Sequence, residues 1–407
     1  MNKKTFAATV TMLRKRANMT QSVLANRLHV SDKTISKWET GMGYPEITLL
    51  PKIAAVFGVT IDYLITGDRR GITVAGNVLT DIVKDIDCYP NVGMLSPIRS
   101  VSKSVGGCVP NTAITLAKLD PSVPISAVGC VGDDENGRYV ITQMQRRNID
   151  TGRIRITDAA PTGFSDVMSL PTGERTHFHA PGANVLFSPE DVDLTGLTCN
   201  MLHIGHLLLL DRFDAADEQY GTAMARFLHA IQNAGIRTSI DIVSDSTADF
   251  PGKIIPALKY CNYVIINEIE CCSIWGMDPR TLDGTLHIPS IREAMERTMA
   301  CGVCDKVIVH SKEAGFCLSQ NGDFTTVASL QLPAEKIKGS VGAGDAFCAG
   351  CLHGIYNQFT DQALLEFASS VAACSLFAEN AVDGIQTKQD VLQIMAYYPR
   401  QALPESI

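Results

Sequence analysis

Residues 342–345 have the types and order that phosphoryl transfer requires. Gly342, Ala343 and Gly344 let the backbone approach a ligand closely, and an apolar run with helical spacing follows them. The start of a helix offers unpaired N–H groups and the positive end of its dipole, which together bind anions. Asp345 is a carboxylate that could deprotonate an attacking hydroxyl group. A plain tight turn between a strand and a helix would have the same sequence.

Two earlier segments have residues suited to a polyhydroxylated ligand. Asp81, which follows the first apolar strand pattern, could accept hydrogen bonds from two adjacent hydroxyl groups. Gly106 and Gly107 permit close approach just before a predicted helix that carries Asn111, whose amide can bond a hydroxyl group. Alone, each segment is more often an ordinary loop or helix cap.

Two further segments suit a nucleotide and its metal ion. Asn267 follows a predicted strand, and Glu270 three residues later is placed to hold Mg²⁺ through water. Ser311 and Gly315 lie in a predicted hairpin that could border a nucleotide. The chain has no Gly-x-x-x-x-Gly-Lys-[Ser/Thr] sequence, which excludes a P-loop kinase.

The elements that must position these residues alternate along the chain after residue 71. The predicted strands are 72–75, 125–128, 201–204, 238–242, 263–266 and 306–310. The predicted helices are 111–119, 137–147, 219–234, 291–300, 345–356 and 361–377. Alternation predicts an α/β domain with a mostly parallel sheet and helices on both faces. Because ligands of such sheets bind beyond the carboxyl ends of the strands, we expect the residues above to meet there.

Composition indicates an ordinary globular chain of two or three domains, with 407 residues, 45% hydrophobic and 19% charged. The most apolar run, Met201–Leu210, is short and contains two histidines, so no membrane span or membrane partner is expected. The basic N-terminus lacks the apolar length of a signal peptide. The 13 scattered cysteines are interpreted as reduced residues of a cytoplasmic protein, and Cys301-x-x-Cys304 alone is a poor metal site.

The first 67 residues differ from the rest in charge and pattern. They hold nine Lys/Arg and four Asp/Glu, a net charge of +5, whereas the whole chain carries −8. Five short helical patterns follow one another, near 5–17, 21–28, 32–39, 47–57 and 61–65. Thr20 and Ser31 are natural N-caps of the second and third. Two short helices with a tight turn and a basic second helix are typical of a helix-turn-helix that meets DNA.

This head, residues 1–67, resembles the Cro/Xre-type DNA-binding domains over almost its full length. The resemblance implies that Ile35 and Trp38 belong to its core and that double-stranded operator DNA is the partner. The residues that would meet DNA are Gln21, Ser31, Asp32, Lys33 and Lys37. An alternative is that these polar side chains are only a solvated helix surface, or that the head binds another protein.

Residues 71–400 resemble the ribokinase-like (PfkB) carbohydrate kinases in the order of their motifs. The resemblance implies a small β lid from segments near 88–102 and 164–179, ATP and Mg²⁺ as cofactors, and a homodimer. The implied roles are a base for Asp345, an anion hole for Gly342, Ala343 and Gly344, sugar binding for Asp81, Gly107 and Asn111, phosphate or nucleotide binding for Asn267, Ser311 and Gly315, and Mg²⁺ binding for Glu270.

Two positions depart from that family pattern. Gly339 stands six residues before the base, where the family usually has an aspartate that helps to hold a monovalent cation, so cation activation is in doubt. His310-Ser311-Lys312 stands where the nucleotide hairpin usually reads Thr-x-Gly, and Lys312 would either crowd the nucleotide or pair with its phosphates.

Two functions are therefore predicted. The first is ATP-dependent phosphorylation of a hydroxyl group of a sugar or nucleoside, with a head that regulates transcription. The alternative is a sugar-responsive regulator whose kinase-like domain senses its ligand with little or no catalysis. The substrate and the operator cannot be read from the residues.

Overall fold

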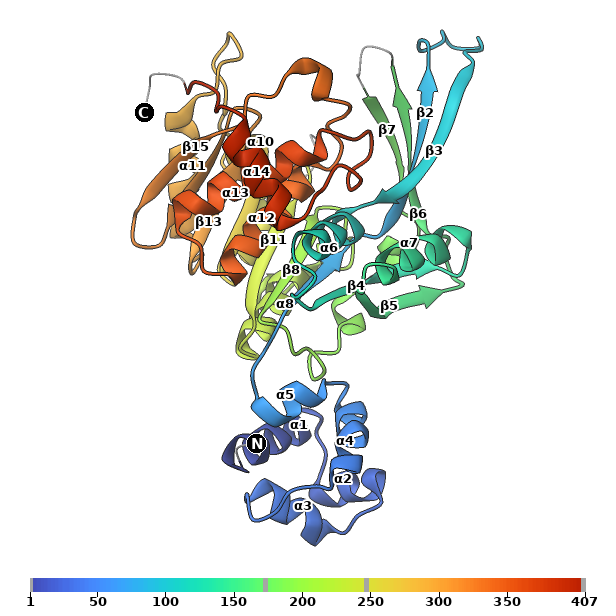
Figure 1. Cartoon of the computed structure of the whole chain (residues 1–407), viewed down its shortest axis with the longest axis vertical. Helices are drawn as coiled ribbons and strands as arrows, with labels where there is room; N and C mark the ends of the chain where they lie inside the picture. Colours follow the sequence, from blue (N-terminus) through green and yellow to red (C-terminus); the bar gives the residue numbers. More distant parts are fainter. Residues whose placement is uncertain (1–2, 171–174, 245–248, 404–407) are drawn as a thin grey trace. The chain divides into compact units, whose positions relative to one another are not determined.

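The computed structural model describes residues 3–170, 175–244 and 249–403, which fold into two compact units (Figure 1). The first unit contains Met1–Gly71 and Val192–Asn200, and the second contains Ile72–Asp191 and Met201–Ile407. The sequence-based boundaries did not group Val192–Asn200 with the head. These residues join it because Nη1 of Arg69 donates to the carbonyl oxygen of Leu197 at 2.7 Å.

The head contains the five helices expected from its sequence, and Figure 1 shows them in blue. They are α1 (Lys3–Arg16), α2 (Gln21–Leu28), α3 (Asp32–Glu39), α4 (Leu50–Phe57, preceded by the 3₁₀ turn η1, Ile47–Leu49) and α5 (Ile61–Thr66). Thr20 and Ser31 cap α2 and α3, as predicted. Ile35 and Trp38 are buried in the core of this unit.

A buried ionic network ties the first three helices of the head together. Arg14 on α1 donates to both carboxylate oxygens of Glu39 on α3, at 2.6 and 2.9 Å. Gln21, at the start of α2, donates to the same carboxylate at 2.7 Å. Burial raises the pKa of Glu39, but the hydrogen bonds from Arg14 and Gln21 outweigh this effect and hold the pKa below its ordinary value.

The second unit is built on a nine-stranded sheet with the order β15-β14-β13-β12-β11-β8-β1-β4-β5. Its strands are β1 (Ile72–Gly76), β4 (Ile125–Gly132), β5 (Asp150–Thr157), β8 (Met201–Leu207), β11 (Arg237–Ile242), β12 (Tyr263–Asn267), β13 (Lys306–His310), β14 (Ala314–Ser319) and β15 (Phe324–Ala328). All neighbours are parallel except β13–β14 and β14–β15. The predicted α/β class, with a mostly parallel sheet, is confirmed.

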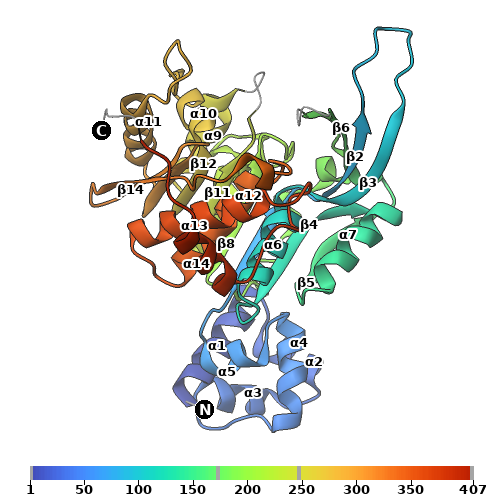
Figure 2. The same ribbon diagram turned by 45° about the horizontal axis from the view of Figure 1, so that its top comes forward.

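Helices cover both faces of this sheet (Figures 1 and 2). They are α6 (Cys108–Leu119), α7 (Glu135–Gln145), α8 (Ala223–Asn233), α9 (Phe250–Leu258), α10 (Glu268–Ser273), α11 (Ile288–Ala300), α12 (Ala343–Tyr356), α13 (Asp361–Ser375) and α14 (Lys388–Tyr397). The 3₁₀ turns η2 (Gly182–Leu186), η3 (Pro189–Asp191) and η4 (Ala334–Lys336) and the short pair β9 (Ala216–Asp217) and β10 (Gly221–Thr222) complete it. Within the described ranges, no helix is long and apolar enough to cross a membrane.

A separate four-stranded sheet, the lid, has the order β3-β2-β6-β7. Its strands are β2 (Leu79–Ile86), β3 (Ile98–Gly106), β6 (Gly163–Ser169) and β7 (Arg175–Ala180). The sequence-based lid segment 88–102 was wrong in its limits: it covers mainly the turn of the β2–β3 hairpin, and β2 was missed. Residues 171–174 of the other predicted segment lie outside the described residues.

Replacing Glu39 with alanine should unfold the head more easily. The change leaves the guanidinium of Arg14, whose side chain is only 12% exposed, without its carboxylate, and we expect a loss of about 3 kcal/mol. Urea unfolding can be followed through Trp38 in a Trp275→Phe background, since the chain has two tryptophans. Glu46→Ala, at an exposed position of the same unit, is the matched control; equal losses in both variants would contradict the prediction.

Candidate active site

Asp345 lies in the first turn of α12, at the carboxyl ends of the parallel strands. It is 9% exposed, and Nδ2 of Asn111 donates to its Oδ2 at 2.9 Å. Its Oδ1 makes a longer contact, 3.4 Å, with Nε2 of His206. Oδ2 is therefore held firmly by Asn111, and Oδ1, which among the described residues has an ion-pair contact rather than a short hydrogen bond, is the oxygen that a ligand can approach.

The three residues before Asp345 form a tight turn that needs glycine. Gly342 has φ 75°, and a β-carbon there would lie 2.3 Å from Cβ of Ala381. A β-carbon on Gly344 would contact the ring of His310 at 3.5 Å. The N–H of Ala343, where α12 begins, makes a long hydrogen bond of 3.4 Å to the carbonyl oxygen of Ser340. The N–H groups of Gly344 and Asp345 have no acceptors within the helix and can receive an anion.

On its other side Asp345 faces a histidine and a second acid that the sequence analysis missed. Nε2 of His206, at the end of β8, lies 3.4 Å from Oδ1 of Asp345 and 3.8 Å from Oδ2 of Asp241, at the end of β11. Burial lowers the pKa of His206, but the hydrogen bond and charge of Asp345 outweigh it and raise the pKa to about 9. Burial also raises the pKa of Asp241.

The lid contributes Asp81, which lies on β2 rather than in a loop after the first strand. Burial, followed by the charge of Asp345, raises its pKa to about 7. A β-carbon on Gly106 would lie 2.5 Å from Oδ1 of Asp81, and one on Gly107 (φ 88°) would lie 2.8 Å from the carbonyl oxygen of Asn77. Glycine at both positions therefore leaves space for the carboxylate of Asp81 and the backbone of Asn77. Asp81, Asn111 and Asp345 meet around one site.

Asn267 and Glu270 form a reciprocal cap at the start of α10. Oδ1 of Asn267 accepts from the N–H of Glu270 at 2.8 Å, and Oε2 of Glu270 accepts from the N–H of Asn267 at 2.9 Å. Oε1 of Glu270 accepts from Oγ of Ser244 at 2.8 Å. Burial raises the pKa of Glu270 to about 7. Since both its oxygens are engaged, this acid suits a metal ion held through water better than one bound directly.

A cavity of about 480 Å³ opens beside the glycine turn. Lys312 is the one lysine or arginine among the described residues that line it, and Ser311 also lines it. Asn267 and Gly315 are not among its lining residues. Gly315 instead packs under the ring of Phe347, where a β-carbon would lie 3.2 Å away. The structure thus gives Gly315 a packing contact, and its predicted nucleotide role stays a prediction.

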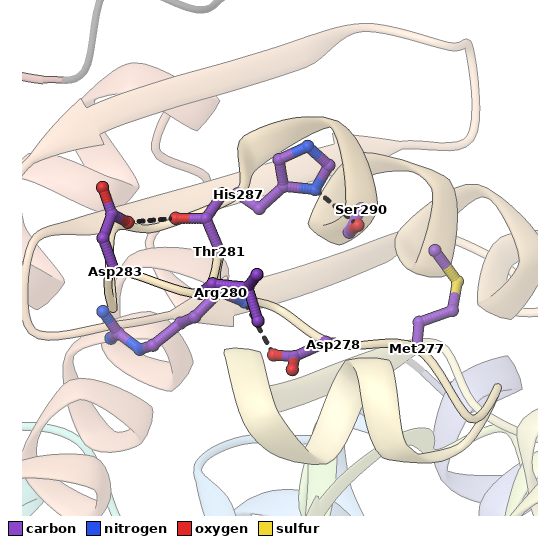
Figure 3. A pocket seen from close by; sticks show the side chains of 8 residues that line it. Met277, Asp278, Arg280, Thr281, Asp283, His287 and Ser290 are labelled. Carbon is purple, nitrogen blue, oxygen red and sulfur yellow. Dashed lines mark hydrogen bonds between the residues drawn. The ribbon is translucent and has the colours of Figure 1, made fainter.

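A second, more open cavity of about 830 Å³ shares no residue with this site (Figure 3). Its one arginine, Arg280, donates to Glu268 at 2.6 Å and to Glu313 at 3.0 and 3.1 Å. Because two acids already pair with this cation, the cavity is a poor anion site. Its lining residues are Met277, Asp278, Arg280, Thr281, Leu282, Asp283, His287 and Ser290.

The predicted DNA-contacting residues have different surroundings in the head. Asp32, Lys33 and Lys37 are exposed on α3. Ser31 is exposed, but its hydroxyl caps α3 by accepting from the N–H of Thr34 at 3.2 Å. The amide nitrogen of Gln21 is bonded to Glu39. The exposed lysines are thus the side chains on α3 best placed to reach a phosphate.

The sheet, the lid and the buried acid at a helix start are the arrangement of a ribokinase-like fold. The family model described as pfkB family carbohydrate kinase matches residues 74–388, and a helix-turn-helix model matches residues 11–64. The chain therefore belongs to the pfkB family of carbohydrate kinases, with an N-terminal helix-turn-helix domain. Kinases of this family use ATP.

Several characterised proteins are similar over most of the chain. The ribokinase of Arabidopsis thaliana is 23% identical over 328 residues, covering 80% of this chain and 81% of that protein. The 5-dehydro-2-deoxygluconokinase of Geobacillus kaustophilus is 22% identical, covering 72% and 85%. The structure of the Arabidopsis ribokinase complexed with ribose and ATP aligns with a TM-score of 0.65 at 20% identity, covering 81% of this chain and 99% of that one. At that identity the likeness shows the fold.

The charge of His206 gives a test by pH. The pKa is about 9 in the folded protein against 6.5 ordinarily, so the stabilisation is complete below pH 6.5 and is lost as the pH rises through 9. Over that window we expect wild type to lose on the order of 2 kcal/mol more unfolding free energy than His206→Gln. Urea unfolding of both proteins at a series of pH values measures the difference. Parallel pH curves would contradict an ion pair at this position.

Proposed function

We propose that the protein transfers the γ-phosphoryl group of ATP to a hydroxyl group of a sugar- or nucleoside-like substrate. The observation that carries the proposal is the setting of Asp345 at the start of α12, with Oδ2 held by Asn111 and, among the described residues, Oδ1 without a short hydrogen bond, 3.4 Å from Nε2 of His206. A carboxylate oxygen in this setting can orient a hydroxyl group and take its proton. The substrate oxygen then attacks the γ-phosphorus, and the bond to the β-phosphate breaks, leaving ADP.

The surrounding residues would divide the binding work. Gly342, Ala343 and Gly344 present backbone N–H groups to the charge on the transferring phosphoryl group. Asp81 and Asn111 hydrogen-bond the hydroxyl groups of the substrate. Gly107, which has no side chain, leaves space for the substrate beside them. The cavity beside the turn takes the nucleotide, and Ser311 and Lys312 border it. Asn267 binds the phosphates of ATP, and Glu270 holds Mg²⁺ through water.

Mg²⁺ fits this acid-rich edge of the sheet. Asp241 and Glu270 are buried carboxylates, and burial, followed by the charges of Glu270 and Asp345, raises the pKa of Asp241. Hard oxygen donors of this kind are what Mg²⁺ prefers. When bound with ATP, the ion would neutralise charge on the phosphates. A monovalent cation has less support, because Gly339 offers no carboxylate.

Asp345→Asn should separate a kinase from a sensor. The amide can still accept from Asn111 but takes no proton, so we expect kcat to fall by about 10²- to 10⁴-fold while ligand binding persists. Thermal shift and ADP release are measured together over a panel of sugars and nucleosides with Mg-ATP. Asp133→Asn, an exposed acid paired with Arg138, is the control.

Sugar phosphorylation by wild type and the control, but not by Asp345→Asn, is the expected result. A ligand that raises the melting temperature of every variant without ADP release from any would instead make the domain a sensor. That outcome would support the second candidate function, a sugar-responsive regulator of transcription.

We also propose that the head binds double-stranded DNA and that the protein acts as a homodimer. The head has a net charge of +5 and exposes Lys33 and Lys37 on α3. The turn of the β2–β3 hairpin exposes the apolar side chains of Val92, Met94 and Leu95, and a second subunit could cover them. A dimer would present two copies of α3 to two half-sites of an operator.

Replacing Lys33 or Lys37 with alanine should weaken DNA binding about tenfold each and reduce its salt dependence. The operator is first selected from a random duplex library, and affinity is then measured by fluorescence anisotropy at several salt concentrations. Lys52→Ala, exposed on α4, should bind normally. Equal affinity for all four proteins, or a monomeric mass by light scattering, would refute the corresponding part of the proposal.

A further inference from the structure

Arg175, the first residue of lid strand β7, reaches the backbone next to the anion hole. Its Nη1 donates to the carbonyl oxygen of Glu379 at 2.7 Å. Its Nη2 lies 3.1 Å from the point that a β-carbon on Gly339 would occupy. The carbonyl oxygens of Ala378 and Glu379 lie 3.1 and 3.2 Å from the same point. Glycine at position 339 therefore leaves the room that the guanidinium uses.

The two backbone segments that Arg175 contacts lie next to the glycine turn of the proposed anion hole. They are residues 338–342, which lead into α12, and residues 376–381. Lys338 donates its N–H to the carbonyl oxygen of Leu376 at 2.8 Å. Gly342 packs on Ala381, where a β-carbon would have to lie 2.3 Å from the alanine Cβ. The two segments and the start of α12 are therefore in direct contact with one another.

The same guanidinium is also part of the lid that carries Asp81. Arg175 pairs with Ser169 on β6, and Ser169 pairs with Asp85 on β2, the strand of Asp81. The charge of Arg175 lowers the pKa of Asp81, against the larger effects of burial and Asp345 that raise it. Arg175 is thus close enough to Asp81 to lower the pKa of that acid. At the same time its guanidinium is hydrogen-bonded to the backbone of Glu379.

We propose that Arg175 is a positioning residue for phosphoryl transfer, which fastens the lid to residues 338–342 and 376–381 and so fixes the anion hole. The proposal rests on the proposed kinase function. Preorganised N–H donors and the exclusion of water are the main contributions a protein makes to this reaction. A guanidinium has several donors in a fixed plane, so it can hold one carbonyl and pack on a second segment at once.

Hydrogen exchange on the full-length protein tests the positioning role without turnover. In Arg175→Ala we expect the amides of residues 338–342 and 376–381 to exchange about tenfold faster, the value of one charge-assisted hydrogen bond. Arg99→Ala is the matched control, since Arg99 is a lid arginine paired with Asp87 on the β2–β3 hairpin. Exchange in Arg175→Ala equal to that of wild type would overturn the proposal.

Turnover then shows whether the positioning serves the reaction. We expect Arg175→Ala to lose about tenfold in kcat and to release more free phosphate per phosphorylated sugar, because an unfastened lid admits water. Arg175→Lys should recover part of the loss, and Arg99→Ala should match wild type. Faster exchange with unchanged kcat and phosphate release would overturn the role in transfer. Absence of turnover in wild type would refute the proposed function, and the exchange comparison would still decide whether Arg175 positions the two segments.

Discussion

The close backbone approach at Gly342 is the constraint on which the site depends. Its left-handed φ of 75° and its contact with Ala381 each exclude a larger residue. Because the turn is so tight, α12 begins at Ala343 and its first turn includes Asp345. One steric condition thus places the carboxylate proposed as the base and the N–H groups proposed as the anion hole within the same helical turn.

The acidic side chains around that turn lie in buried surroundings that disfavour their charged forms. Burial raises the pKa of Asp81, Asp241 and Glu270, and the one charged imidazole beside them is that of His206. Groups perturbed in this way are concentrated at functional sites, where a ligand supplies the missing partner. Here hydroxyl groups of a substrate would satisfy Asp81, and a divalent cation would favour the ionised form of Glu270.

The elements predicted from sequence were those whose patterns are local. Six buried strands were found because β-branched runs stand out, and Asp345 because three small residues precede it. His206 and Asp241 were missed because each follows an apolar strand without a motif, and they meet Asp345 only through the strand order β11-β8-β1. Strand β2 was missed because Asp81, Lys84 and Asp85 interrupt its apolar residues, so it lacks the continuous β-branched run of the central strands. The contact between Arg175 and Gly339 depends on pairing across the lid, which a single sequence does not reveal.

The departures from the family pattern argue for altered support of the phosphates rather than for loss of chemistry. Gly339 removes a carboxylate, but the space it leaves is occupied by the guanidinium of Arg175, a cation that belongs to the chain itself. Lys312 adds a second cation, on the wall of the cavity beside the glycine turn. Lys312 thus adds positive charge where ATP would lie, whereas Arg175 adds it at the lid, beside the backbone that leads into α12. Positive charge beside ATP favours a polyanionic donor, and the acids of the sugar side favour a neutral, hydroxyl-rich acceptor, which is the pairing that the reaction requires.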